Sequence, residues 1–269
     1  MRKTFLLLLG SAAMLLGGCE SAPITGRSQI MLVSESQERQ MGLQAYRQVL
    51  SSERPSHNAQ ITSLVEKVGR RIAQAAEHPP DGMWKPPHYH WEFKVIEKDM
   101  PNAFCLPGGK VAVYSGLLPL ARTEAGLAVV IGHEVAHALA RHGAERMSDS
   151  IVASVGVAAA SIVLASTVSG DNRTYMPLMM GVLGAGATVG FLLPMSRAQE
   201  SEADRIGLVL MALAGYDPRE GVGLWQRMRA ANTGGRQAEW LSTHPANETR
   251  IEDIRRWVPE AMKYYRPHD

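Results

Sequence analysis

The chain contains 269 residues, of which 45% are hydrophobic and 20% are charged, and its formal net charge is +2. This length is sufficient for a substantial hydrophobic core, and we expect residues 19–269 to form a single domain. The charge is mild, and the sequence has neither internal repeats nor interleaved basic and aromatic residues. We therefore exclude nucleic acid as a partner.

The first 18 residues resemble a secretory signal peptide. Two basic residues precede a short apolar segment at positions 4–16, which is too short for a confident membrane span. Leu16-Gly17-Gly18-Cys19 then resembles a bacterial lipoprotein box, which implies cleavage before Cys19 and acylation of this cysteine. Because Glu20 replaces the aspartate that retains such proteins in the inner membrane, the resemblance implies a lipid anchor at the periplasmic face of the outer membrane. The alternative is an ordinary cleaved signal.

Cys105 is the remaining cysteine if Cys19 is acylated, because the chain has 2 cysteines. An intramolecular disulfide could then not form, even in an oxidising compartment. We expect Cys105 to be a buried small apolar residue. Intermolecular pairing, or control of a nearby site by its thiol, is the alternative.

Two helices are predicted near the start of the mature chain. Ser34 and Gln37 have the spacing of a capping box for a helix that runs to about Ser52. Asn58 is expected to cap a second helix that runs to about Glu77, with its apolar residues on one face. The proline-rich stretch 78–90 is predicted to be a loop, with its three histidines on the surface because they lack the spacing of metal ligands.

Alternating apolar and polar residues predict strands at 91–95 and 110–114, with Pro107-Gly108-Gly109 supplying a turn. An open edge at residues 102–106 could hold an extended peptide by addition of a strand. The alternative is an ordinary structural hairpin, because periodicity cannot show which edge is free.

The stretch His133-Glu134-Val135-Ala136-His137 has the pattern H-E-x-x-H. Its surroundings are apolar, and Thr123 marks the start of the helix. On a helix, His133 and His137 lie one turn apart and can bind one zinc ion per chain. Glu134 lies between them, where it can take a proton from a water whose pKa zinc lowers to roughly 7.

Residues 150–195 contain two apolar runs, rich in alanine, glycine and serine, on either side of Gly170-Asp171-Asn172-Arg173. This pattern resembles a helical hairpin, which would return the chain to the side of the H-E-x-x-H helix. We expect its helices to pack beside or over the cleft. Two membrane spans are the alternative, with peripheral membrane contact or self-association as further options.

A third zinc ligand is expected 63 residues after His137, in a helix that contains Glu200 and Asp204. These two residues share one face. Glu200 can therefore bind the metal while Asp204 accepts the second N–H of a ligating histidine. Glu202 points elsewhere and is expected to be a solvated carboxylate.

His244-Pro245 precedes a predicted helix that runs from Glu248 to Trp257. A histidine followed by proline on a loop is more often part of a turn than of a functional site.

Five motifs together resemble the gluzincin zinc metallopeptidase family that includes HtpX, the CAAX prenyl endopeptidases and BepA: Asn102-Ala103-Phe104, Pro107-Gly108-Gly109, His133 to His137, Glu200 to Asp204 and Ser242-Thr243-His244-Pro245. The resemblance implies an α+β, predominantly helical fold with a small sheet lining the cleft. It implies that Glu200 is the third ligand, that Asp204 orients a zinc-bound histidine, and that Asn102, Ala103 and Phe104 bind substrate. It also places His244 near the zinc, as an inhibitory fourth ligand or as a group that stabilises the oxyanion.

The predicted function is a zinc endopeptidase of the bacterial cell envelope that hydrolyses misfolded or misassembled envelope proteins. In its organisation the chain resembles the small LoiP-like lipoproteins of the family, and it could form homo-oligomers or bind envelope proteins. A latent protease that acts as a chaperone or binding module, with a gated zinc site, is the alternative. A prenyl-protein protease is disfavoured because the export signal would separate it from prenylated substrates.

Overall fold

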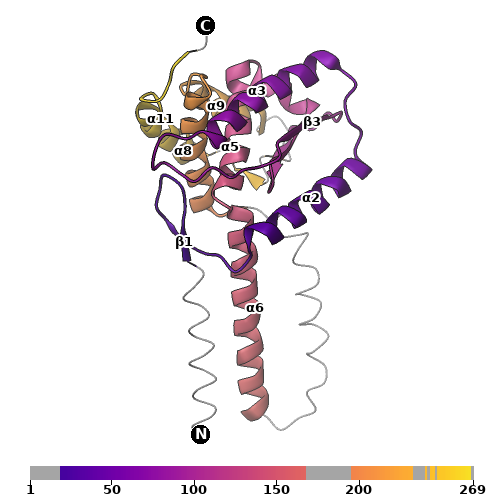
Figure 1. Cartoon of the computed structure of the whole chain (residues 1–269), viewed down its shortest axis with the longest axis vertical. Helices are drawn as coiled ribbons and strands as arrows, with labels where there is room; N and C mark the ends of the chain where they lie inside the picture. Colours follow the sequence, from indigo (N-terminus) through magenta and orange to yellow (C-terminus); the bar gives the residue numbers. More distant parts are fainter. Residues whose placement is uncertain (1–18, 168–194, 233–239, 241–242, 246, 268–269) are drawn as a thin grey trace.

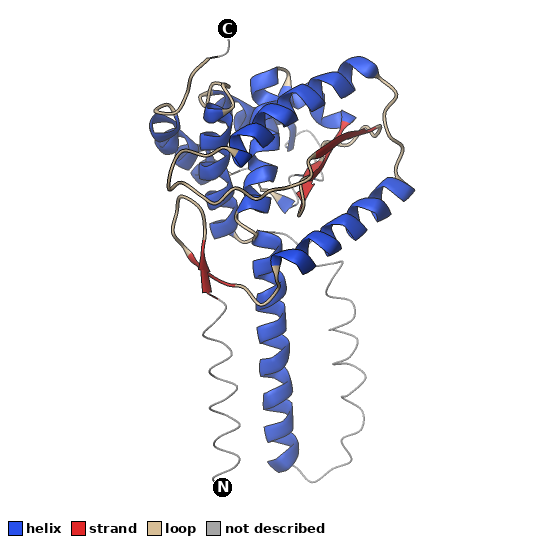
Figure 2. Cartoon of the chain, in the orientation of Figure 1, coloured by secondary structure: helices blue, strands red, loops and turns tan. Residues whose placement is uncertain are grey.

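The computed structural model describes residues 19–167, 195–232, 240, 243–245 and 247–267. Most of these residues are helical, and two small sheets accompany the helices (Figure 2). The predicted α+β, predominantly helical fold is therefore confirmed. The predicted signal peptide lies outside the described residues.

The centre of the fold is helix α5, which spans Glu124–Leu139 and is buried along almost its whole length. Helix α8 (Arg197–Leu213) crosses it, and helices α3 (Ala59–Glu77) and α9 (Glu220–Asn232) pack against its other sides (Figure 1). A helix that is apolar on all sides is stable in water only when other elements cover it, which explains this central position.

Helices α5 and α8 approach closely at two glycines. A Cβ atom on Gly207 would lie 3.0 Å from the backbone nitrogen of His133, and one on Gly132 would lie 3.0 Å from the carbonyl oxygen of Gly207. No larger residue fits between these backbones without moving them. The crossing therefore brings the H-E-x-x-H helix into direct contact with the helix that contains Glu200.

Helix starts agree with the capping signals in the sequence. Helix α2 (Glu35–Ser52) begins with a complete capping box between Ser34 and Gln37, and the side chain of Asn58 caps α3. Thr123 caps α5. Helix α8 starts before Glu200, because Ser196 forms a further capping box at its beginning. Helix α11 spans Glu248–Ala261, so it continues beyond the predicted end.

The larger sheet has the strand order β3-β5-β4, with β3 at Glu92–Ile96, β4 at Ala103–Leu106 and β5 at Lys110–Tyr114. Strand β5 pairs in parallel with β3 and antiparallel with β4. The predicted turn at 107–109 therefore joins β4 to β5. Within the described part of the chain, no strand pairs with the other edge of β4.

Helix α6 (His142–Thr167) projects away from the other helices (Figure 1). The described part of the predicted hairpin thus does not fold back over α5, and the rest lies at 168–194, outside the described residues. The first turns of α6 pack against Met31 and Val33. Among the helices that are described, none combines the length and the apolar character that crossing a membrane requires.

The N-terminal segment, which we define as residues 19–33, contains the antiparallel strands β1 (Cys19–Ser21) and β2 (Ser28–Ile30). The turn between them includes Ile24 and Gly26, both with positive φ. Neither strand was predicted. The short 310 helix η2 (Ser115–Leu117) and helix α4 (Leu118–Ala121) complete the fold by leading from β5 into α5.

Candidate metal centre

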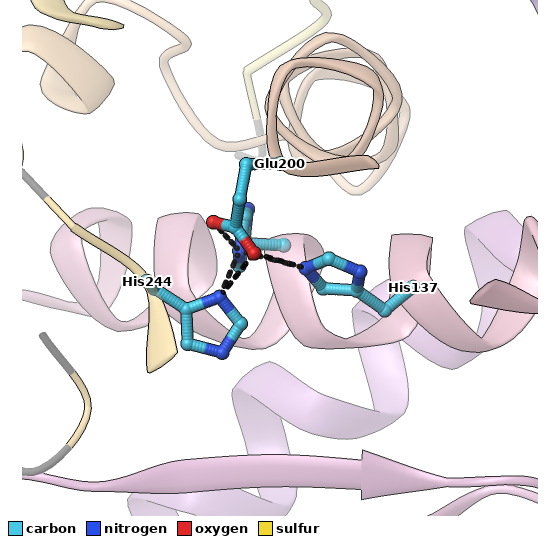
Figure 3. A group of neighbouring side chains, drawn as sticks. His137, Glu200 and His244 are labelled. Atoms are coloured by element: carbon cyan, nitrogen blue, oxygen red, sulfur yellow. Dashed lines mark hydrogen bonds and ion pairs between the residues drawn. The ribbon is translucent and has the colours of Figure 1, made fainter. Parts of the chain in front are cut away.

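Four buried side chains converge where α5 meets α8. His133 and His137 extend from α5 and Glu200 from the first turn of α8, while His244 lies on the segment before α11. One ligand atom from each of these residues lies within 4.8 Å of the ligand atoms of the other three. Figure 3 shows Glu200 pointing between His137 and His244.

Three separations between these atoms fit a tetrahedral metal ion, while the fourth, 2.7 Å between Nδ1 of His244 and Oε1 of Glu200, is that of a hydrogen bond. The Nε2 atom of His133 lies 3.1 Å from Nε2 of His137 and 3.2 Å from Nδ1 of His244, and Nε2 of His137 lies 3.4 Å from Oε1 of Glu200. Metal–ligand bonds of 2.0–2.1 Å in a tetrahedron separate the ligand atoms by about 3.3–3.4 Å. Imidazole and carboxylate are also the donors that zinc accepts, so the residues present fit this metal.

Glu200 is held in the ionised form that a ligand requires. Burial alone would raise the pKa of this carboxyl, but interactions with His133, His137 and His244 hold the pKa far below its ordinary value. Its Oε2 atom is buried without a hydrogen bond, although Nη1 of Arg250 lies 2.7 Å away. The other oxygen, Oε1, faces Nε2 of His137 and Nδ1 of His244 and is therefore the one placed to bind a metal.

Asp204 lies behind His133. Its Oδ1 atom is 3.0 Å from Nδ1 of His133, on the opposite side of the ring from the other donors. Arg250, in the first turn of α11, donates to both oxygens of Asp204 over 2.6 and 2.9 Å, and its guanidinium lies 3.5 Å from the centre of the Trp225 ring. Sequence reasoning missed Arg250, because an arginine at a helix start carries no signal of a distant carboxylate.

Glu134 is buried beside the cluster of donors. Its Oε1 atom accepts a hydrogen bond of 2.6 Å from the indole of Trp240, and Nε2 of His244 lies 3.6 Å from the same oxygen. Trp240 was not predicted as a site residue, because 106 residues separate it from Glu134. The carboxylate is therefore fixed at one oxygen while the other makes no hydrogen bond to the donors.

A pocket of about 210 Å³ joins the predicted substrate strand to these groups. Its walls include Asn102, Ala103 and Phe104 on one side and Glu134 with His137 on the other. His244 also lines it. A larger hollow of about 1160 Å³ lies between the N-terminal segment and residues 81–90, but none of the predicted metal donors lines it.

Other predicted residues have mixed outcomes. Cys105 is half-buried, and burial raises the pKa of its thiol, which agrees with an unreactive apolar role. The histidines of the 78–90 loop are exposed, as predicted. Cys19 begins strand β1, and its acylation stays a prediction.

The prediction for Glu202 is wrong. This residue is only 4% exposed, and it pairs with Arg27 and His142. It does point away from Glu200, but that side of α8 is covered by α6 and by the N-terminal segment. The residue pattern of α8 alone could not show that other segments cover this side of the helix.

Comparisons with known proteins agree with the geometry. The sequence profile of Peptidase family M48 matches residues 55–258. The mitochondrial metalloendopeptidase OMA1 of Schizosaccharomyces pombe is 38% identical over 263 residues, which cover 95% of this chain and 71% of that relative. OMA1 of Saccharomyces cerevisiae is 34% identical, with 96% and 76% covered. The beta-barrel assembly-enhancing protease of Escherichia coli is 31% identical, with 88% and 47% covered.

These relatives correct one prediction. Proteins that match almost the whole chain are named as mitochondrial, which points away from a lipoprotein of the bacterial outer membrane. The predicted outer-membrane location is therefore wrong. It depended on the first 20 residues, and so short a segment is weaker evidence than a match along the chain. The narrower resemblance to LoiP-like lipoproteins stays a prediction.

The family profile covers most of the chain, including the H-E-x-x-H helix and the residues that meet it from α8 and α11. The relatives that match are named as metalloendopeptidases or as a protease. The chain belongs to Peptidase family M48 and is a zinc metalloendopeptidase.

Proposed function

We propose that this endopeptidase cleaves extended segments of misfolded or misassembled proteins of a membrane-bounded envelope. The observation that carries the proposal is the pocket that brings Glu134, the metal donors and strand β4 together. The name of the Escherichia coli relative, a beta-barrel assembly-enhancing protease, supports this class of substrate.

His133, His137 and Glu200 would hold the metal. Zinc, when bound, supplies a Lewis acid that polarises a peptide carbonyl and makes a water acidic near neutral pH. The burial of the three ligands removes competing solvent, which strengthens every charge interaction in the pocket. Asp204 accepts the Nδ1–H of His133 and so keeps the lone pair of Nε2 directed at the metal position.

Glu134 is the general base of the proposed reaction. Trp240 occupies its Oε1 atom, so Oε2 is the oxygen that takes a proton from the attacking water. The same oxygen then returns the proton to the leaving amine. Holding the carboxylate at one oxygen keeps the other in a fixed position, which general base catalysis requires.

His244 is proposed to occupy the fourth ligand position when no substrate is bound. Its Nδ1 atom lies 2.7 Å from Oε1 of Glu200 and 3.2 Å from Nε2 of His133, so it points at the other donors. Such a ligand has to leave before a water and a carbonyl can be accommodated. This geometry supports the fourth-ligand role over oxyanion stabilisation.

Strand β4 is the proposed binding site for the substrate backbone. Its free edge, among the described residues, can pair with an extended segment, and Asn102, Ala103 and Phe104 also line the pocket. A buried site with a pocket of about 210 Å³ does not admit a folded protein surface. Unfolded or locally opened chains are therefore the proposed substrates.

The decisive experiment compares the zinc-loaded parent with its Glu134→Gln variant on a denatured membrane protein and on the same protein in folded form. We expect the parent alone to cleave, and only the denatured substrate, while both proteins bind equal amounts of zinc. Mutation of a general base typically lowers the rate by about 10²–10⁴-fold.

Two outcomes would contradict the proposal. Equal cleavage by the variant would exclude Glu134 as the base. Absence of cleavage by either protein, with zinc bound and aggregation of the denatured substrate suppressed, would favour the alternative chaperone function.

A further inference from the structure

A second buried polar cluster lies behind His137, on the side of the ring that faces away from the other metal donors. It contains His142 from the start of α6, Glu202 from α8 and Arg27 from the N-terminal segment. His142 is fully buried, and Glu202 is 4% exposed. Polar groups at such depth persist only when they satisfy one another.

A chain of hydrogen bonds connects this cluster to the metal donors. The Nδ1 atoms of His137 and His142 are 2.7 Å apart, and Nε2 of His142 is 2.9 Å from Oε2 of Glu202. Nε2 of His137 faces the other donors and has to keep its lone pair for a metal, so its proton resides on Nδ1. His142 then accepts at Nδ1 and donates from Nε2 to Glu202.

Glu202 is fixed in turn by the N-terminal segment. Arg27 donates from Nε and Nη2 to Oε2 of Glu202 over 3.0 and 2.8 Å, and the hydroxyl of Thr25 donates to the other oxygen. The same guanidinium also pairs with Glu145 of α6. Arg27 thus joins α6 to α8 directly behind the H-E-x-x-H helix.

Glu145 anchors the outer side of the cluster. Its Oε2 atom accepts hydrogen bonds from Gln29 at 3.0 Å and from Gln199 at 2.8 Å, in addition to the bond from Arg27. Burial would raise the pKa of this carboxyl, but these donors lower it to about 2. The carboxylate therefore stays ionised and keeps Arg27 in place.

The residues that close the cluster lie outside the region that defines the family. Thr25, Arg27 and Gln29 precede residues 55–258, which the family profile matches. The N-terminal segment is held to the same region by a further ion pair, between Glu20 and Arg141 at the end of α5. Its contacts thus converge on the end of the helix where His137 is located.

We propose that His142 and Glu202 are positioning residues that orient the His137 ring and hold it in its ligand tautomer, and that the N-terminal segment, through Arg27, completes the metal centre. Asp204 does the same for His133 from the other side of the site. The inference rests on the proposed ligand role of His137. Loss of such a partner typically weakens metal binding by about 10–100-fold.

The test measures zinc affinity by competition with a chelator, and the visible absorption of the Co²⁺-loaded protein, in two His142 variants of the full chain. His142→Leu removes the acceptor for the His137 Nδ1–H, whereas His142→Asn retains an oxygen near the position of Nδ1. We expect zinc affinity to fall about 10–100-fold in His142→Leu, with an altered Co²⁺ spectrum, and to stay within a few-fold of the parent in His142→Asn. Equal loss in two folded variants, or no loss in either, would overturn the role of His142.

A matched pair tests the N-terminal segment. Arg27→Met removes the donor to Glu202. Arg39→Met is the control, because Arg39 forms an exposed ion pair with Glu35 within α2. We expect weaker zinc binding in Arg27→Met and unchanged binding in Arg39→Met. The same affinity in both would overturn the role of the segment, even if His142→Leu fails to fold.

These outcomes are separate from the proposed function. A parent that binds no zinc would contradict the ligand assignment itself. A parent that binds zinc, with variants that bind equally well, contradicts only the positioning roles.

Discussion

Single residues at this site act by compensating charges that are removed from water. Arg250 has this role for Asp204 and Glu200, all three being nearly inaccessible to solvent. Trp225 covers the guanidinium from the other side. Because an unpaired buried charge is costly, the arginine is as necessary to the folded site as the carboxylates are.

We expect Arg250→Met to lower the free energy of unfolding of the metal-free protein by about 3–5 kcal/mol, because two buried carboxylates lose their partner. Chemical denaturation measures this value. Arg205→Met is the matched control, since the pair that Arg205 forms with Glu260 is about one-third exposed and should contribute at most about 1 kcal/mol. Similar decreases in the free energy of unfolding in both variants would contradict the role of Arg250 as the partner of two buried carboxylates.

The sequence was sufficient to predict the residues that depend on local spacing. The H-E-x-x-H pattern, together with Glu200 and Asp204 one helical turn apart, predicted which side chains would meet, and the structure brings them together. Trp240 could not be predicted in this way, because its contact with Glu134 depends on tertiary packing. The roles of the predicted residues in metal binding and catalysis stay predictions until variants are measured.

At the scale of elements, the crossing of α5 and α8 determines whether the site can form. The two backbones touch at Gly132 and Gly207, one turn or less from His133 and Asp204. A wider separation would move the third ligand away from the two histidines. The distance between these helices therefore determines the geometry of the metal site as well as the packing of the core.

We expect Gly207→Ala to lower the melting temperature and to weaken zinc binding, because its Cβ would meet the backbone of His133 at about 3.0–3.1 Å. Calorimetry and chelator competition measure the two effects. Gly223→Ala in α9 is the control, since the nearest atom is the end of the Arg227 side chain at 3.2 Å and alanine favours a helix. If Gly207→Ala had the same melting temperature and zinc affinity as this control, the helices could separate without loss of stability or of metal binding.

The residues at which helices begin could be predicted from local sequence, whereas the pairing of strands could not. Capping boxes at Ser34 and Ser196 fix where α2 and α8 begin, and the first of these was predicted from sequence. The parallel pairing of β3 with β5 joins residues 18 positions apart and leaves no local pattern. The N-terminal strands have 3 residues each, too few for a period to be recognised.

At the scale of the whole molecule, the chain gathers ionisable groups from distant segments into one buried network. Glu145 illustrates the consequence for stability. The pKa of this carboxyl is about 2 in the folded protein, against an ordinary value of 4.5. A group with a lowered folded pKa stabilises the native state above its unfolded pKa and loses this effect as the pH falls through the folded value.

We expect the metal-free parent to lose stability as the pH falls from 4.5 towards about 2, because protons bind the unfolded Glu145 first. Glu145→Gln should lack this part of the pH dependence, so the difference in free energy of unfolding between the two proteins should shrink across the same range. Denaturation at a series of pH values provides the comparison. A constant difference would show that Glu145 titrates normally in the fold.

The distances along the chain also set the order in which the centre can be assembled during synthesis. Arg27 reaches Glu202 across 175 residues, and Arg250 reaches Asp204 across 46. When the ribosome has just completed α5, the H-E-x-x-H helix exists without its third donor, without Glu202 behind His137 and without the arginine that neutralises Asp204. A nascent chain therefore lacks the third metal donor until α8 has emerged, and it lacks the arginine that fixes Asp204 until α11 has emerged.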